Sequence, residues 1–296
     1  MDDGQTFDIV VQVTNPDLDP NRVPIRKRID LADDLCIEIF RADIVQKIFK
    51  ACEPKGADFD PYRQLNQMYS FVRENPPKGD DLKWDNDQRL QRCIALSRLI
   101  HPTNISTEYA ARIFLTSEGN LKKIVPGPIA SNSSQAFVID TSLNCFTEID
   151  AQNLKRVIEA FDKKPLEDPL ARAMWYHEYA ARSYEIDLKL VLIATGIEVI
   201  VHIDRYKSTR QFVKRVQKLS IDVGAGTITK NQAEKMYEFR SSLAHGQGLG
   251  GITSEKKELY GKMEDVLRWT IQKSILEESF RDFISNPDEI RKAWPV

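Results

Sequence analysis

Hydrophobic residues follow two different patterns in the two halves of the chain. In residues 150–296 they recur at intervals of three and four, the spacing of amphipathic helices. This pattern predicts six helices, the last of them broken once: Ala151–Phe161, Pro169–Glu185, Leu188–His202, Thr209–Leu219, Lys230–His245 and Ser254–Ile284. The second half is therefore expected to form a helical bundle.

Start and stop signals support several of these helices. Asp168 before Pro169 predicts an N-cap with proline at the first helical position. Thr229 and Gln232 have the spacing of a capping box in front of the helix that starts at Lys230. Gly246 is a natural left-handed stop after His245.

Residues 1–149 mix strand, helix and turn patterns. Strands are expected at Phe7–Val13, Leu35–Phe40 and Ala136–Ile139, and helices at Tyr62–Glu74 and Asp87–Leu99. Segments 16–24, 75–79 and 126–134 are rich in Pro, Gly and other turn residues and are expected to be loops. We therefore predict a mainly α protein, with a smaller α+β region of regulatory or recognition function (1–149) before a helical domain (150–296).

Composition narrows the function classes. The chain has 296 residues, with 42 Lys and Arg against 44 Asp and Glu, so it is not basic throughout and any nucleic-acid site must be local. Residues 1–150 hold 18 basic and 23 acidic residues (net -5), and the remainder hold 24 and 21 (net +3), which suggests different roles for the halves. We expect no cofactor.

The same composition predicts the compartment. The four cysteines form no CxxC pair and no zinc-ligand spacing, as expected for reduced cytoplasmic thiols. The longest apolar stretch, Leu190–Ile203, is shorter than the roughly 20 residues of a membrane span. The start of the chain also lacks a signal-peptide pattern. We expect a cytoplasmic protein without a membrane partner.

An Arg-x4-His pair ends the fifth predicted helix. Arg240 is followed by the polar Ser241, and His245 by Gly246, whereas a second such pair, Arg172 and His177, lies within a helix and is expected to be a partly exposed structural pair. A guanidinium can hold a phosphate and an imidazole can transfer protons near neutral pH, as metal-free RNA cleavage requires. The alternative is a structural arginine beside a histidine that caps the helix.

A carboxylate interrupts the most apolar helix. Glu198 lies within Val191–Val201, where an acid is costly unless a cation pairs with it. This helix, the basic helix after it and the segment Met236–Gly246 together resemble HEPN domains, particularly the ApeA-like branch. The resemblance implies a helical bundle, usually dimeric, and in active members a metal-independent ribonuclease of toxin, antiviral defence or RNA-processing systems.

The resemblance also assigns roles. Arg240 would hold the scissile phosphate, His245 would move protons, Glu198 would orient Arg240, and Ser241 would assist by hydrogen bonding, although many active members have Asn, Asp or His at that position. Glu198 could instead form a structural pair with Arg182. RNA, a second copy of the chain and a regulatory protein or antitoxin are the expected partners. The alternative function is a non-catalytic module that binds a protein, a nucleotide or RNA.

Helix geometry bears on how such a site could assemble. Residues five apart in a helix differ by about 140° in direction and about 7.5 Å along the axis, so Arg240 and His245 do not share one face. Either the helix unwinds after Ser242, or a two-fold dimer brings both residue types of both chains into one cleft, which we favour.

Two further groups could contact RNA. Lys207, Arg210, Lys214 and Lys218 fall on one helical stripe, which could follow an RNA backbone or could simply be a solvated face. Trp175, Tyr176, Tyr179 and Tyr184 recur near helical spacing. We expect these aromatic residues to be core or dimer contacts rather than platforms for base stacking.

Overall fold

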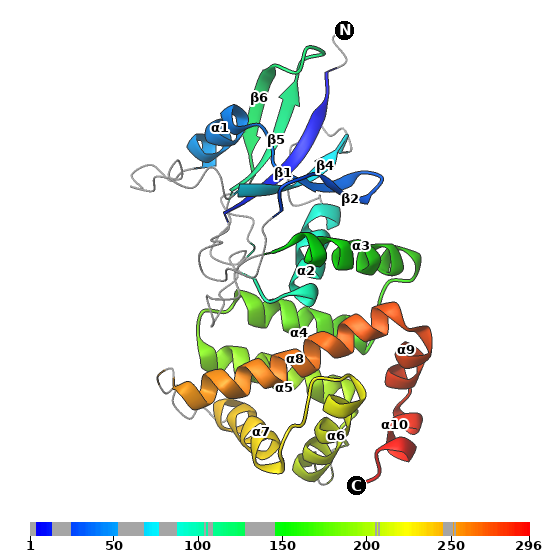
Figure 1. Ribbon diagram of the computed structural model, residues 1–296. Coiled ribbons are helices and arrows are strands. Elements are labelled where there is room, and N and C mark those ends of the chain that lie inside the picture. The colour runs from blue at the N-terminus through cyan, green and yellow to red at the C-terminus, as the bar shows by residue number, and fades with distance from the viewer. Residues whose placement is uncertain are drawn as a thin grey trace. The chain divides into compact units, whose positions relative to one another are not determined.

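The computed structural model describes residues 4–13, 25–52, 68–76, 88–103, 105, 109–127, 146–204, 206, 208–244, 251 and 253–296. Over these residues the protein is mainly α, with an antiparallel sheet of six strands in its N-terminal half (Figure 1). The chain divides into two compact units, Met1–Glu159 and Ala160–Val296.

The first unit is built on the sheet, whose strand order is β2-β3-β4-β1-β5-β6. In its centre β1 pairs antiparallel with β4 and β5, placing Ile9 opposite both Val72 and Ala111. The strands are β1 (Thr6–Val13), β2 (Ile29–Ala32), β3 (Leu35–Glu38), β4 (Met68–Glu74), β5 (Tyr109–Leu115) and β6 (Leu121–Pro126).

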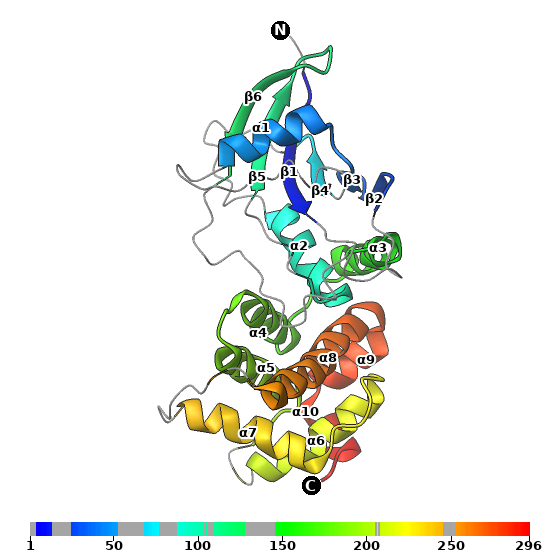
Figure 2. The same cartoon turned by 60° about the vertical axis from the view of Figure 1, so that its left-hand side comes forward.

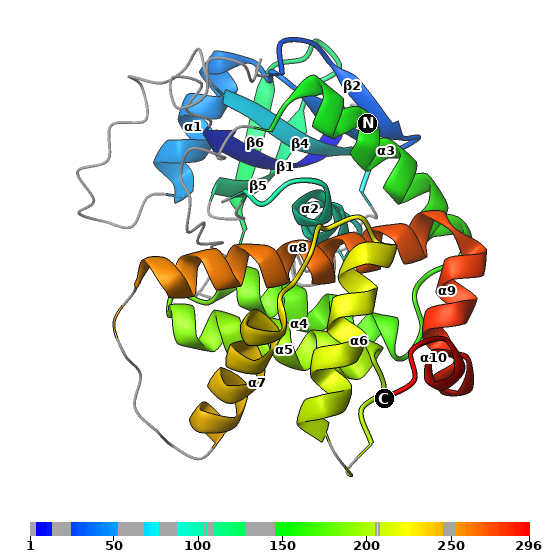
Figure 3. The same ribbon diagram turned by 60° about the horizontal axis from the view of Figure 1, so that its bottom comes forward.

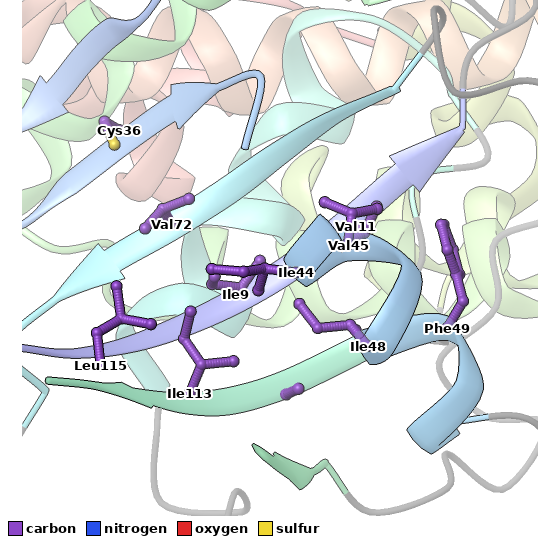
Figure 4. Close-up of a cluster of buried hydrophobic side chains, with 11 residues drawn as sticks. Ile9, Val11, Cys36, Ile44, Val45, Ile48, Phe49, Val72, Ile113 and Leu115 are labelled. Carbon is purple, nitrogen blue, oxygen red and sulfur yellow. The ribbon is translucent and has the colours of Figure 1, made fainter. Parts of the chain in front are cut away.

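Helix α1 (Ala42–Cys52) covers one face of this sheet (Figure 2). Its Ile44, Ile48 and Phe49 pack with strand residues such as Ile9 and Val72 in a fully buried cluster (Figure 4). Side chains alternate along a strand, so Phe71 points to the other face, where its ring lies 6.1 Å from that of Phe146. Two more helices belong to this part of the chain, α2 (Gln88–Ile100) and α3 (Glu148–Lys163).

The sequence predictions for this half are confirmed in part. The strands at Phe7–Val13 and Leu35–Phe40 and the helix at Asp87–Leu99 are present as β1, β3 and α2. The helix predicted over Tyr62–Glu74 is wrong, because residues 68–74 form β4, whose backbone pairs with both β1 and β3. The sequence analysis missed α1, β2, β5 and β6. The strand predicted at Ala136–Ile139 and most of the predicted loop residues lie outside the described residues.

The second unit is helical. All six helices predicted over residues 150–296 are present, the first of them as α3, the last is broken once, and a short helix that was not predicted follows it. After α3 come α4 (Leu170–Arg182), α5 (Ile186–Ile200), α6 (Ser208–Asp222), α7 (Lys230–Ala244), α8 (Ser254–Leu276), α9 (Glu278–Ser285) and α10 (Pro287–Ala293). Helices α4 and α5 form an antiparallel hairpin against which α8 packs, and α5 and α6 both contact α7 (Figure 3).

Local interactions explain where these helices begin and end. The capping box is confirmed: the Thr229 backbone N–H donates to Gln232 Oε1 (3.0 Å), and that of Gln232 donates to Thr229 Oγ1 (3.2 Å). The predicted Asp168 cap is wrong, because Pro169 occupies the N-cap position and the Asp168 carboxylate pairs with Arg172 instead. At the break after α8, the buried Arg281 guanidinium donates to the carbonyls of Ser274 and Ile275. These carbonyls belong to the last turn of α8, so Arg281 completes its C-terminus.

Helix α5 is the most apolar helix of the second unit. Its inward side chains Leu190, Ile193 and Ile197 are completely buried. It has 15 residues. Within the described residues, no helix combines the length and the apolar character that crossing a membrane requires.

Candidate active site

Helices α5 and α7 bring a carboxylate and a guanidinium together near the C-terminal end of α7. Glu198 on α5 and Arg240 on α7 form an ion pair, with 2.7 Å between Glu198 Oε2 and Arg240 Nη2. Helices α5 and α7 pack against each other, so residues 42 positions apart in sequence meet in one site. The alternative partner of Glu198, Arg182, pairs with Glu178 one turn earlier on its own helix.

Tyr237 supports Arg240 from the same helix. It lies one turn before Arg240, and its ring centroid is 5.8 Å from the guanidinium carbon. The Tyr237 hydroxyl donates a 2.8 Å hydrogen bond to Ser208 Oγ at the start of α6. Its ring also packs on Phe212, with centroids 5.4 Å apart. Arg240 therefore contacts both a carboxylate and an aromatic ring, and α6 holds that ring in place.

The pair is half-buried, which matters for its electrostatics. The Glu198 side chain is 18% exposed and that of Arg240 is 34% exposed, so water reaches the guanidinium more easily than the carboxylate. Burial raises the pKa of Glu198, and the opposing charge of Arg240 offsets only part of this rise. The guanidinium keeps donors available beyond the Glu198 contact, and a fork of this kind suits a phosphate.

The other predicted catalytic residues, Ser241 and His245, follow Arg240 in the sequence. Ser241 is half-buried and follows Arg240 in α7. The described part of α7 ends at Ala244, so His245 and Gly246 lie outside the described residues. The structure thus brings Glu198 and Arg240 together, with Ser241 next to Arg240 in the chain.

The predicted basic stripe lies on α6. Arg210, Lys214 and Lys218 are all exposed, whereas Lys207 lies outside the described residues. The start of α6 meets α7 at Tyr237, and Gln217 near its end bonds to the Ile228 carbonyl just before α7. The two helices therefore run antiparallel, and Arg210 is at the end of the stripe nearer to Arg240.

Arg215, which interrupts the exposed charges of α6, has a structural role. It is buried, and its Nη1 donates to the carbonyls of Val201 (2.9 Å) and His202 (2.5 Å). These groups follow the end of α5, so Arg215 satisfies the C-terminus of the helix that carries Glu198. Arg215 is not part of the predicted stripe, and its structural role was not predicted.

The second Arg-x4-His pair differs from its prediction. His177 is buried rather than partly exposed, and its Nε2 lies 2.8 Å from Glu264 Oε1 on α8. Arg268 Nε donates to the same carboxylate at 3.3 Å. Arg172, in contrast, is exposed and pairs with Asp168. The two residues therefore belong to different environments, and His177 helps to hold α4 to α8.

The aromatic residues predicted as core or dimer contacts lie on α4 and, in the case of Tyr184, just after it. Trp175, Tyr179 and Tyr184 are exposed and Tyr176 is half-buried, so a core role is wrong for the three exposed residues, whereas dimer contact stays a prediction. Each of Trp175 and Tyr179 stands on the side of α4 opposite the buried Ala173, His177 and Ala180. No pattern of residue types distinguishes this outward face from a buried one, because aromatic residues are typical of both.

Comparisons of the chain with models of protein families, with curated proteins and with solved structures find no match. Within the described ranges, no group of three or more His, Cys, Asp or Glu side chains is placed to hold a metal ion. The site must therefore be interpreted from its own residues.

Proposed function

We propose that the chain is a cytoplasmic RNA endonuclease of the HEPN type that acts as a homodimer and cleaves RNA without a metal ion. The observation that supports this proposal is the ion pair between Glu198 and Arg240. Burying a carboxylate in an apolar helix costs free energy unless a cation pairs with it. Here the cation is the arginine of the Arg-x4-His segment, and the pair fixes the direction of a phosphate-binding group.

RNA supplies its own nucleophile in this reaction. The 2′-oxygen of one ribose forms a bond to the adjacent phosphorus, and the bond from that phosphorus to the 5′-oxygen of the next nucleotide breaks. One His245 imidazole takes the 2′-hydroxyl proton, and an imidazolium gives a proton to the leaving 5′-oxygen. The product strands end in a 2′,3′-cyclic phosphate and a 5′-hydroxyl.

The remaining residues stabilise the charge of the transition state or hold Arg240 in position. Arg240 neutralises the charge that builds on the phosphoryl oxygens, which is most effective when the cation is already in place before reaction. Glu198 and Tyr237 hold Arg240 in that place, and Ser241 donates a hydrogen bond to the phosphate. An isologous dimer supplies the two imidazoles that acid and base catalysis need, because each protomer contributes the same residue near the two-fold axis.

The dimer has a direct test. Activity per chain should fall on dilution with the same midpoint as dimer dissociation measured by sedimentation. A chain that retains full activity as a monomer would contradict the shared site. A regulatory protein or antitoxin, which the resemblance implies, would restrain the activity by covering this site.

The test of the function is cleavage of a mixed cellular RNA pool in EDTA, with the product ends mapped. The wild-type chain should cut and leave cyclic-phosphate ends, and Arg240→Ala and His245→Ala should each abolish cutting while the proteins remain folded and dimeric. Products with a 3′-hydroxyl, or equal cutting by all three proteins, would refute the proposal. Equal inertness of all three would favour a non-catalytic module that binds a protein, a nucleotide or RNA.

A further inference from the structure

The outward face of α4 carries arginine and aromatic side chains in series. Arg172, Trp175, Tyr179 and Arg182 are separated by three, four and three positions, so they lie along one face of the helix. We call these four residues the α4 stripe. Trp175 is 50% exposed and Tyr179 is 46% exposed, although both side chains are large and apolar.

The two rings of the stripe lie against each other and form one aromatic platform. The centroids of Trp175 and Tyr179 are 4.1 Å apart with 37° between the ring planes. Tyr176 supports the indole from the side, at 5.0 Å and 79°. The exposed part of such a ring pair can stack with an unpaired base, because every base has a π face whatever its sequence.

The charges of the stripe suit a nucleic-acid backbone. Arg172 Nε lies 3.2 Å from Asp168, and both side chains are more than half exposed. Arg182 Nε donates to Glu178 at 2.7 Å. The Arg182–Glu178 pair is less exposed (33% and 13%), whereas the exposed Arg172–Asp168 pair is weak, so a phosphate can replace Asp168 as the partner of Arg172 while water solvates the aspartate.

The stripe lies close to the helix that carries Glu198. A Cβ atom at Gly196 of α5 would lie 3.2 Å from Tyr176 Cβ, so Tyr176 rests directly on Gly196. Glu198 is two residues further along α5 and points about 200° away from Gly196. A strand that reaches from Arg240 to the stripe must therefore pass around α5, over the half-buried Thr195 and Val199, and then over α4 to its outward face.

We propose that the α4 stripe binds unpaired nucleotides of the RNA, with bases stacked on Trp175 and Tyr179 and phosphates bound by Arg172 and Arg182. This inference rests on the proposed function for the identity of the ligand, and it adds that the substrate is single-stranded beside the cleaved bond. A duplex keeps its bases stacked on each other and cannot use the platform.

A protein partner fits this face less well. Covering the stripe with protein would remove the exposed Arg172–Asp168 pair from water, and desolvation of an ion pair offsets most of its attraction. The cores of protein interfaces are enriched in arginine and aromatic residues but depleted of acidic ones such as Asp168. Single-stranded RNA leaves the edges of the stripe in water.

The experiment measures the affinity of the full chain for a labelled single-stranded oligouridylate in EDTA, in an Arg240→Ala background so that the RNA stays intact. Trp175→Ala and Tyr179→Ala should each weaken binding by about fivefold to a hundredfold, the range measured for loss of one base-stacking ring. Trp175→Phe should retain most of the affinity. Ile149→Ala removes another exposed apolar side chain, on α3, and should change nothing. Circular dichroism checks that the variants fold, as expected for substitutions of exposed residues.

Each outcome bears on one of the two proposals. Unchanged affinity in Trp175→Ala and Tyr179→Ala overturns the stripe, even if the wild-type chain cuts RNA and the nuclease proposal stands. Dissociation of a dimer by these substitutions, without loss of RNA affinity, overturns it in favour of a protein contact. Binding that depends on the stripe in a chain that cuts no RNA supports the stripe and refutes the nuclease.

Discussion

At Glu198, the effect of a substitution on activity can be distinguished from its effect on stability. The pKa of Glu198 is raised by burial, so the carboxyl takes up a proton at a higher pH than an ordinary glutamate, and it then loses its attraction for Arg240. A group with a raised folded pKa contributes stability only in its protonated form, so its ionised form at neutral pH does not stabilise the fold. Glu198→Gln should therefore fold with only a modest loss of stability.

The activity of this variant should suffer more than its stability. Without the charge that orients Arg240, we expect RNA cleavage to fall by about a hundredfold, the scale of a small misplacement of a catalytic group. In the wild type, activity should also decline as pH falls through the raised pKa of Glu198, and the part of the acid limb that Glu198 produces should be absent from the Glu198→Gln profile. Collapse of the fold in this variant, seen by circular dichroism, would show that Glu198 has only a structural role.

Glu264 represents the opposite electrostatic case. Burial by itself would raise its pKa, but Arg268 and His177 together lower it below the ordinary glutamate range. A carboxyl with a lowered folded pKa stabilises the protein above its unfolded pKa, and this stability is lost as pH falls through the folded pKa. The network should therefore make the C-terminal unit sensitive to acid.

Substitution tests this network. Glu264→Gln leaves the buried Arg268 without its closest buried carboxylate, so the free energy of unfolding at neutral pH should fall by about 3 kcal/mol. The variant should also lose part of the acid dependence of unfolding measured in denaturant. Glu289→Gln, which removes one exposed carboxylate paired with Lys292, should change stability by less than about 0.5 kcal/mol. Equal effects of the two substitutions would contradict the importance of burial.

At the scale of elements, two helical glycines should respond to alanine in opposite ways. A Cβ at Gly196 would come within 2.8 Å of Leu267 Cδ2 and 3.2 Å of Tyr176 Cβ, so Gly196→Ala should push α4 and α8 from α5 and destabilise by about 1–3 kcal/mol. Gly261 in α8 has no neighbouring atom within 4 Å of such a Cβ. Gly261→Ala should therefore stabilise by about 0.5–1 kcal/mol, the ordinary gain in helix propensity. Thermal unfolding of both variants gives the two signs directly.

The helices could be predicted from sequence because each carries its own signal. Apolar residues repeat along α6 and α7, and the capping box at Thr229 fixes the start of α7 without help from the rest of the chain. Strand β4 gives no such signal, because its hydrogen bonds go to β1 and β3, which are distant in sequence. The short strands β2 and β6 were missed for the same reason: they depend on the completed sheet. Helix α1, in contrast, has Ile44, Val45, Ile48 and Phe49 at helical spacing, a local signal that the sequence analysis overlooked.

In the candidate site, too, some residues could be identified from local sequence and others only from contacts between helices. Glu198 and Arg240 could be identified because an acid in an apolar run and an Arg-x4-His pair are unusual in themselves. The roles of Tyr237, which supports Arg240, and Arg215, which completes α5, depend on contacts between helices. Exposure of Trp175 and Tyr179 likewise depends on which face of α4 the other helices leave uncovered. Of these three features, only the role of Tyr237 had a local signal in the sequence, which is its position one turn before Arg240.

At the scale of the whole molecule, charge and architecture change at nearly the same place. Residues 1–150 have a net charge of -5 and residues 151–296 a net charge of +3. The compact units divide after Glu159, within α3, whereas the sequence analysis placed the boundary at 149/150, near the start of that helix. The unit with the positive balance is the one that carries Arg240, the α6 charges and the α4 stripe, so attraction for RNA should come from this unit.

The final prediction measures this attraction as a salt dependence. Each phosphate neutralised by a lysine or arginine releases counterions, so for single strands the slope of log affinity against log salt changes by about 0.7 per contact. Replacing Arg210, Lys214 and Lys218 together by Gln should therefore reduce this slope by about 2 if all three contact phosphates. Replacing three exposed cations of α3, Lys155, Arg156 and Lys163, removes the same charge elsewhere and should leave the slope almost unchanged. Equal slopes for both triple variants would mean that the α6 charges form a solvated face and that RNA approaches Arg240 by another route.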